Sequence, residues 1–216
     1  MSINIASNYK KLKAQIPKGI NLLAVSKGNS STSIRQLIEL GQFHFGESKL
    51  QEALPKIGQL REFSNLTWHF IGRIQSNKVR GILKSFDVIH SVDSLLLAEK
   101  ISRISLEEKK TPRIMFQVKL RDDPQKGGFL RNEILDMWPK LCELPNLQTI
   151  GLMTMSPIDL KVNERILLFR ECRLLADQLK LRECSMGMSQ DWMEAIQEGA
   201  TWLRLGSSLF RNRIDK

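Results

Sequence analysis

The chain has 216 residues, of which 42% are hydrophobic and 26% charged, an ordinary balance for a globular protein with one large core. Its formal net charge of +10 would suit a polyanionic partner, but lysine and arginine are spread along the whole chain, so we expect no specific nucleic-acid binding. It contains no apolar stretch of transmembrane length and no signal-peptide pattern, which predicts a cytoplasmic protein without membrane association.

The chain begins with a predicted helix over residues 4–16, followed by a short apolar run over 22–26 that leads into Lys27. Gly19 and Gly28 bound this run, as expected for a buried strand of a parallel sheet. A lysine held in such a strand would be desolvated, which favours its neutral amine and a Schiff base with a carbonyl compound. The alternative is a solvated lysine in the loop beyond the strand. The run alone leaves both interpretations open.

Short apolar runs then alternate with amphipathic helical stretches along the rest of the chain. Together with 22–26, the predicted strands cover residues 44–46, 68–71, 88–91, 114–120, 149–153, 184–186 and 202–205. Residues 30–33, 93–94 and 189–191 are typical helix starts, and Gly41 and Gly199 are typical helix stops. The apolar positions with helical spacing are Ile34, Leu37, Ile38, Leu95, Ala98, Ile101, Ile134, Leu135, Trp138, Leu141, Ile166, Phe169, Leu174, Leu175, Trp192, Ala195 and Ile196.

Eight strands that alternate with helices form either a closed barrel or an open doubly wound sheet. The count of eight favours the barrel. We therefore predict an α/β fold, a single (β/α)8 TIM-type barrel with an extra N-terminal helix. No linker or shift in composition divides the chain, so residues 1–216 are predicted to form one domain.

Cysteine and histidine, the usual ligands of transition metals, show no metal-binding spacing in this chain. The cysteines are odd in number and lie next to apolar residues, which predicts reduced core thiols for Cys142, Cys172 and Cys184. The histidines lie in or beside predicted strands, where a hydrogen-bonded core role is more common than a catalytic one: His44, His69 and His90.

Polar residues follow the last two predicted strands, at the face of such a barrel that usually carries the active site. Ser189 follows strand seven, and Gly206 and Ser207 follow strand eight. A phosphate group commonly binds between these two loops, where backbone N–H groups and hydroxyls can reach it. Ordinary turns and helix caps explain the same residues, with Ser189 capping the next helix.

Strand eight also carries Arg204, whose side chain the alternation along the strand would direct into the mouth of the barrel. A buried guanidinium stays charged and needs an acceptor. We expect that acceptor to be a carboxylate such as Glu47, or the ring nitrogen of a ligand.

Eight short motifs occur in order along the chain. They are Ala24-Val-Ser-Lys27; Phe45-Gly-Glu47 with Gln51 and Glu52; Trp68-His-Phe-Ile-Gly72 with Gln75-Ser-Asn-Lys78; His90-Ser-Val-Asp-Ser94; Lys126-Gly127; Gly151-Leu-Met153; Ser185-Met-Gly-Met-Ser189 with Asp191; and Arg204-Leu-Gly206 with Phe210. From about residue 22 to residue 213, this series resembles the pyridoxal phosphate homeostasis protein family.

The resemblance implies a single barrel like the N-terminal domain of alanine racemase, the fold-type III barrel of pyridoxal phosphate proteins. Lys27 resembles the lysine that forms the Schiff base with pyridoxal 5′-phosphate, and Arg204 resembles the arginine that faces the pyridine nitrogen. Such an arginine leaves that nitrogen unprotonated and weakens the electron sink that carbanion chemistry needs. The other cofactor contacts that the resemblance implies are Ser189, Gly206 and Ser207 for the phosphate, and Ser185, Ser48, His69 and Met153.

Two positions depart from the family pattern. Ser48 stands where the family usually has asparagine after Phe-Gly-Glu; its side chain is shorter and offers one hydroxyl, so a polar contact to the substituents of the ring would be weaker. Lys119 stands where the fifth strand usually ends in asparagine, which adds a second amine near the barrel mouth.

These features predict a monomeric carrier that binds pyridoxal phosphate reversibly and delivers it to pyridoxal-phosphate-dependent apoenzymes, not an enzyme. Racemisation needs an acid or base on each face of the cofactor, and Lys27 supplies only one. In the alanine racemase pattern the second is a tyrosine, whereas this chain has only Tyr9, in the predicted N-terminal helix, and stops soon after strand eight. The alternatives are a racemase-like enzyme and a regulator that acts through the basic surface.

Overall fold

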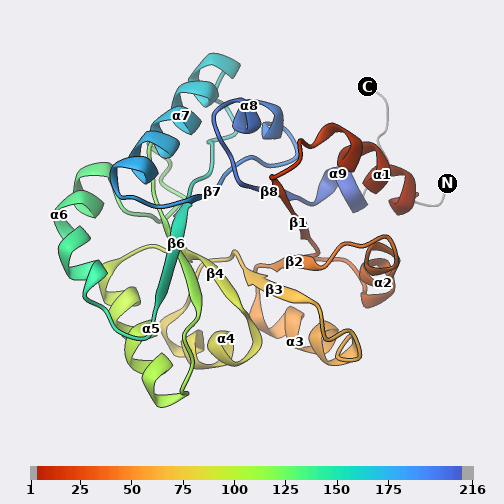
Figure 1. The fold of residues 1–216 in the computed structure, drawn as a ribbon, viewed down its shortest axis with the longest axis horizontal. Helices are drawn as coiled ribbons and strands as arrows, with labels where there is room; N and C mark the ends of the chain where they lie inside the picture. The colour runs from red at the N-terminus through yellow and green to blue at the C-terminus, as the bar shows by residue number, and fades with distance from the viewer. Residues whose placement is uncertain (1–3, 211–216) are drawn as a thin grey trace.

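The computed structural model describes residues 4–210 and folds them into a closed barrel of eight parallel strands, which confirms the predicted (β/α)8 fold (Figure 1). The strands pair in chain order, and the first pairs with the last, so the sheet has no exposed edge. They are β1 (Asn21–Val25), β2 (His44–Glu47), β3 (Thr67–Phe70), β4 (Val88–Val92), β5 (Arg113–Gln117), β6 (Gln148–Met153), β7 (Glu183–Ser185) and β8 (Trp202–Leu205).

Helices form the outer layer around this barrel (Figure 1). Within residues 4–210, none of them combines the length and apolar character needed to cross a bilayer. They are α1 (Ile5–Gln15), α2 (Ser31–Glu39), α3 (Leu50–Gln59), α4 (Val79–Ser85), α5 (Leu95–Glu107), α6 (Arg131–Cys142), α7 (Val162–Gln178), α8 (Trp192–Gln197) and α9 (Ser207–Phe210), with a 3-10 turn η1 (Ser76–Lys78) before α4.

The extra N-terminal helix is α1, which packs beside α2 and α9 at the edge of the barrel (Figure 1). Tyr9 and Leu12 are buried on its inner face, and Asn8 Nδ2 donates a hydrogen bond to the carbonyl of Leu209 at 3.1 Å. Because α9 directly follows β8, this contact ties the helix to the segment that follows the last strand.

Two helices, α3 and α4, were not among those predicted from the sequence, although both carry apolar residues at helical spacing. Helix α3 contains Pro55, and α4 has only seven residues, among them Gly81. A Cβ atom at Gly81 would lie 2.7 Å from Leu50 Cδ2, so the glycine allows α4 to approach α3 closely. Close packing between helices therefore stabilises one element that contains a proline and another that is only about two turns long.

Most of the predicted helix ends are confirmed. Ser94 Oγ accepts a hydrogen bond from the Leu97 N–H at 3.3 Å and so caps α5. Gly41 and Gly199 adopt positive φ angles of 87° and 82° directly after the last turns of α2 and α8. Ser189 is the exception, because it accepts from the backbone of another loop instead of capping α8.

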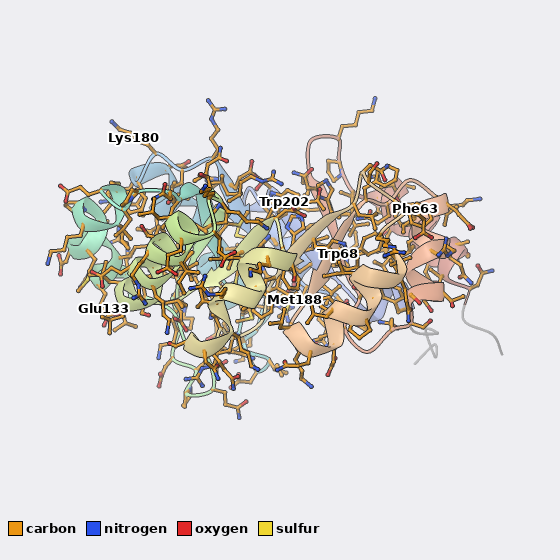
Figure 2. The ribbon with its side chains drawn as sticks, turned by 90° about the horizontal axis from the view of Figure 1, so that it is seen from below. Phe63, Trp68, Glu133, Lys180, Met188 and Trp202 are labelled. Atoms are coloured by element: carbon orange, nitrogen blue, oxygen red, sulfur yellow. The ribbon has the colours of Figure 1, made fainter. Side chains whose placement is uncertain are left out.

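Buried side chains fill two compartments. Large apolar residues such as Phe45, Phe116 and Phe169 fill the layer between strands and helices. The inside of the barrel holds Trp202 and a small apolar cluster of Leu23, Met115 and Met153. In the side view of Figure 2, Trp202 lies among the strands, and Met188 lies nearer the face at which the strands end.

Two residues predicted to lie in the core are on the surface instead. Cys172 and Cys184 are buried free thiols as predicted, but Cys142 is exposed because it is the last residue of α6, where the neighbouring Leu141 already fills the core position. Leu174 is 62% exposed, since Leu168 and Leu175 provide the buried face of α7.

Candidate functional site

A cavity of about 540 Å3 opens at the carboxyl ends of the strands, the face where barrels of this type carry their sites. Its walls come mainly from the segments that follow β1, β2, β3, β6, β7 and β8. Six of the predicted site residues line it: Lys27, Ser48, Ser189, Arg204, Gly206 and Ser207.

Two predicted cofactor residues, His69 and Met153, do not line the cavity. Both side chains are fully buried inside the barrel. Ile71 and Met155 lie two residues further along the chain and do line the cavity. Because alternate residues of a strand point to the same side, His69 and Met153 occupy the layer beneath the cavity. A direct contact with a ligand in the cavity is therefore not expected for them.

Lys27 lies two residues beyond β1 and is exposed, so the loop interpretation of its position is correct. Its side chain nevertheless lines the cavity, and no acceptor within residues 4–210 binds its amine. Gly28 turns the chain with a φ of 72°, and Asn29 Nδ2 donates to the Lys27 carbonyl at 3.1 Å. The turn thus holds the backbone while the amine is free to reach a ligand.

The loops after β7 and β8 meet beside the cavity. The Ser208 N–H donates to Ser189 Oγ at 3.2 Å, so Ser189 keeps its own hydroxyl hydrogen for another acceptor. A Cβ atom at Gly206 would lie 3.2 Å from the Val25 carbonyl oxygen, so glycine allows the loop after β8 to pass close to the end of β1. Ser207 also lines the cavity. The two loops can therefore offer serine hydroxyls to an anion, and an anion can come close to the backbone at Gly206.

The buried side chain of Arg204 forms part of the cavity wall. Nη1 donates to the carbonyl oxygen and to Oγ of Ser185 at 2.6 and 2.8 Å, and Nη2 donates to the carbonyl of Thr154 at 2.7 Å. Three of its five N–H groups are used in this way, and two are left for a ligand. Burial lowers the pKa of Arg204 to about 10, so it stays charged at neutral pH. Ser185 itself is outside the lining and reaches the cavity through Arg204.

Of the two acceptors expected for Arg204, the carboxylate of Glu47 is wrong, and the ring nitrogen of a ligand stays a prediction. Glu47 forms a buried ion pair with Lys56 of α3, in which Lys56 Nζ lies 2.7 Å from Oε1. Lys56 also donates to the Ser26 carbonyl at 2.9 Å, and Ser26 Oγ donates to the same carboxylate oxygen at 2.7 Å. The side chain of Glu47 points outward to α3 and not into the barrel, since the preceding residue, Gly46, faces Leu23 inside the barrel. The pair fixes the end of β1 directly before Lys27.

Lys56→Met is expected to lower the free energy of unfolding by about 3–5 kcal/mol, because it leaves the fully buried Glu47 carboxylate without its counter-ion. Urea unfolding followed by circular dichroism measures the loss. The double variant Glu47→Gln with Lys56→Met removes the charge as well and should recover most of it. A single variant within about 1 kcal/mol of the wild type would contradict this role for the pair.

Three histidines form a hydrogen-bonded row inside the barrel, which is the core role predicted for them. His44 Nδ1 lies 3.1 Å from His69 Nε2, and His69 Nδ1 lies 2.8 Å from His90 Nε2. His90 Nδ1 lies 2.9 Å from Ser185 Oγ. Burial is the main cause that lowers the pKa of all three imidazoles, and that of His90 falls to about 3. The row is therefore neutral at physiological pH.

Two charged residues of the lining were not predicted as site residues. Asp191 Oδ1 accepts from the Met188 N–H at 2.6 Å, and burial raises the pKa of its carboxyl group. Arg165 of α7 lines the cavity and donates from Nη2 to Glu194 Oε1 at 2.7 Å. The motif after strand seven could have indicated Asp191, whereas Arg165 comes from a helix and no strand-end pattern marks it.

The cavity thus combines three kinds of group. Lys27 offers a nucleophilic amine, Arg204 offers N–H donors from the wall, and Ser189 with Ser207 offers hydroxyls for an anion. Within residues 4–210, no three histidine, cysteine or carboxylate side chains are grouped to hold a metal ion. The arrangement suits a small anionic ligand that carries a carbonyl group and a ring acceptor.

The fold and the cavity define the class of protein as a barrel of the alanine racemase type. The family model described as alanine racemase, N-terminal domain, matches residues 2–213. The pyridoxal phosphate homeostasis protein of Synechocystis is 43% identical over 214 residues, which cover 96% of this chain and 98% of the relative. The protein of the same name from Pseudomonas aeruginosa is 37% identical over 97% of this chain and 96% of its own length.

The solved structures add a ligand-bound relative. PipY of Synechococcus elongatus, with pyridoxal phosphate bound, superposes with a TM-score of 0.92 at 41% identity and covers 96% of this chain and 100% of its own. The chain therefore belongs to the pyridoxal phosphate homeostasis protein family. The resemblance stated from its motifs is confirmed.

Proposed function

We propose that this protein binds pyridoxal 5′-phosphate as a Schiff base on Lys27 and buffers and delivers the cofactor inside the cell. The observation that carries the proposal is the cavity itself, where an unpaired amine, a charged guanidinium with two spare N–H groups and a pair of serine hydroxyls meet. The relative PipY, which binds pyridoxal phosphate, supports the choice of ligand.

The chain's own residues fit each part of this cofactor. The Lys27 amine would condense with the aldehyde and release water. Ser189 and Ser207 would donate hydroxyl hydrogens to the phosphate next to Gly206, and Ser48 would contact the ring substituents. Arg204 would donate to the pyridine nitrogen. When bound, the cofactor supplies an electron sink for carbon acids.

A charged arginine opposite the pyridine nitrogen favours a carrier over a strong catalyst. Arg204 cannot give up its proton at neutral pH, so the ring nitrogen stays unprotonated and the electron sink stays weak. Tyr9 is buried in α1 and is not part of the cavity lining, so it does not supply the second acid or base of a racemase. We therefore propose a carrier without strong activity of its own, with pyridoxal-phosphate-dependent apoenzymes as the recipients and a monomer as the working form.

Reductive trapping tests the proposal. Purified protein is mixed with pyridoxal phosphate, its visible absorbance is recorded, and borohydride is added. The Schiff base is expected to give a visible band that disappears on reduction, with the added mass on the peptide that contains Lys27. Labelling spread over several surface lysines, or no band at all, would refute the site. Prompt loss of the band in the presence of an amino acid is the sign of reversible binding.

A further inference from the structure

A continuous hydrogen-bonded chain runs through the barrel from the cavity wall. Starting at Arg204, it passes through Ser185, His90 and His69 and ends at His44. The successive distances are 2.8, 2.9, 2.8 and 3.1 Å. Each member comes from a different strand, and the side chains of His69, His90 and Ser185 are almost fully buried. The Trp202 ring packs against it, with centroids 5.0 Å from His44 and 4.9 Å from His69.

The chain has a defined direction because a guanidinium can only donate hydrogen bonds. Ser185 Oγ therefore accepts from Arg204, and its own hydrogen is left for His90 Nδ1. His90 Nδ1 must be unprotonated to accept it, so the neutral ring carries its hydrogen on Nε2 and donates to His69. By the same step His69 donates to His44. One fixed charge thus selects the same tautomer in all three rings.

The reverse direction is unfavourable in this surrounding. If His90 donated from Nδ1, the Ser185 oxygen would accept from both His90 and Arg204, and its hydroxyl hydrogen would have no acceptor among the hydrogen bonds of the described residues. The charges that act on His90 are those of Arg204 and Arg113, both positive, so its cationic form is also disfavoured. The buried row remains neutral and oriented away from the cavity.

We infer that Ser185 and His90 are positioning residues for Arg204 in the pyridoxal phosphate site. Ser185 Oγ is a good acceptor for Nη1 while its own hydrogen is bound by His90, and the carbonyls of Ser185 and Thr154 hold the other two N–H groups. Together these contacts fix the rotation of the guanidinium and aim its two remaining N–H groups. The identity of the ligand rests on the proposed function, whereas the direction of the chain does not.

The tautomers can be read without any cofactor. Long-range proton–nitrogen NMR spectra of cofactor-free protein with 15N-labelled histidine distinguish a protonated Nδ1 from a protonated Nε2. We expect His69 and His90 to carry their hydrogen on Nε2 in the wild-type protein. In Ser185→Ala, we expect His90 to show a mixture of the two tautomers. A protonated Nδ1 on His90 in the wild-type protein would overturn the inferred direction.

A matched pair of variants tests the positioning role. His90→Asn retains an acceptor for the Ser185 hydroxyl, and His90→Leu removes it. Affinity for pyridoxal phosphate, measured by absorbance titration, should stay within about threefold for asparagine and fall about tenfold for leucine. If circular dichroism shows that the leucine variant is poorly folded, Ser185→Ala takes its place, and the same loss of affinity is expected because the acceptor for Arg204 Nη1 is removed.

The outcomes separate the inference from the proposed function. Equal affinity of the folded leucine and alanine variants and the wild type would overturn the positioning role while leaving the proposed function intact. A wild-type protein that gives the expected tautomers but no reductive label on Lys27 would overturn the proposed function while leaving the direction of the chain intact.

Discussion

Lys27→Ala is expected to abolish the visible absorbance band that forms with pyridoxal phosphate and to prevent any borohydride-fixed label. Lys27 is the lysine that lines the cavity, and no residue within 4–210 engages its amine. The phosphate and ring contacts from Ser189, Ser207 and Arg204 would remain, so weak non-covalent binding should persist. We expect the apparent affinity to fall by at least about tenfold, equivalent to about 1.4 kcal/mol.

Lys119→Ala is the matched control for that experiment. Lys119 is the amine that departs from the family pattern, but it lies outside the cavity lining and points toward Asp122, with Nζ 3.9 Å from the carboxylate. The control should keep both the band and the label. If Lys119→Ala loses the band while Lys27→Ala keeps it, the assignment of the Schiff base to Lys27 is wrong.

Acidification is expected to destabilise the fold through the histidine row. Burial, together with the smaller effect of the positive charges of Arg204 and Arg113, lowers the pKa of His90 from 6.5 to about 3. Between these pH values the unfolded chain binds a proton that the folded protein cannot bind, so stability is complete above about pH 6.5 and is lost as the pH falls toward 3. The full difference between the His90 pKa values of the unfolded and folded states corresponds to on the order of 5 kcal/mol of unfolding free energy.

Urea unfolding at a series of pH values measures this effect. Between pH 7 and pH 4.5 we expect a loss of roughly 3 kcal/mol from His90, with further loss from His69, whose pKa burial also lowers well below its ordinary value. His90→Asn removes one of these titrations and keeps an acceptor for Ser185. Its stability should therefore depend less steeply on pH. Equal slopes for the variant and the wild type would show that His90 binds a proton without unfolding.

The local pattern of the chain was enough to predict the barrel. All eight predicted strands exist, because buried parallel strands are short apolar runs and the turns between them carry glycine and polar residues. The prediction was wrong at one strand end and omitted two helices. β5 ends at Gln117 and not at 120, since Val118 forms only an isolated bridge with Phe129. Helices α3 and α4, which were not predicted, pack against each other, α3 also against β2 and α4 also against α5.

The composition of the cavity was also predictable in large part. Lys27, Ser189, Arg204 and Gly206 follow or end strands, and a closed parallel barrel brings all such positions to one face. The depth of a side chain was harder to infer. His69 lies two residues before Ile71, which lines the cavity, and so its side chain is one layer deeper inside the barrel. Position in the sequence alone does not distinguish these two layers.

By itself, the sequence determined the order of the strands, the membership of the family and most of the residues gathered at the carboxyl ends of the strands. Only the tertiary structure decided which polar groups meet. Arg204 donates to Ser185 and Thr154 and not to Glu47, and the three histidines join in one row. The physical reason is that the strand period fixes which side a residue faces, whereas the partner on that side depends on the stagger and closure of the whole barrel.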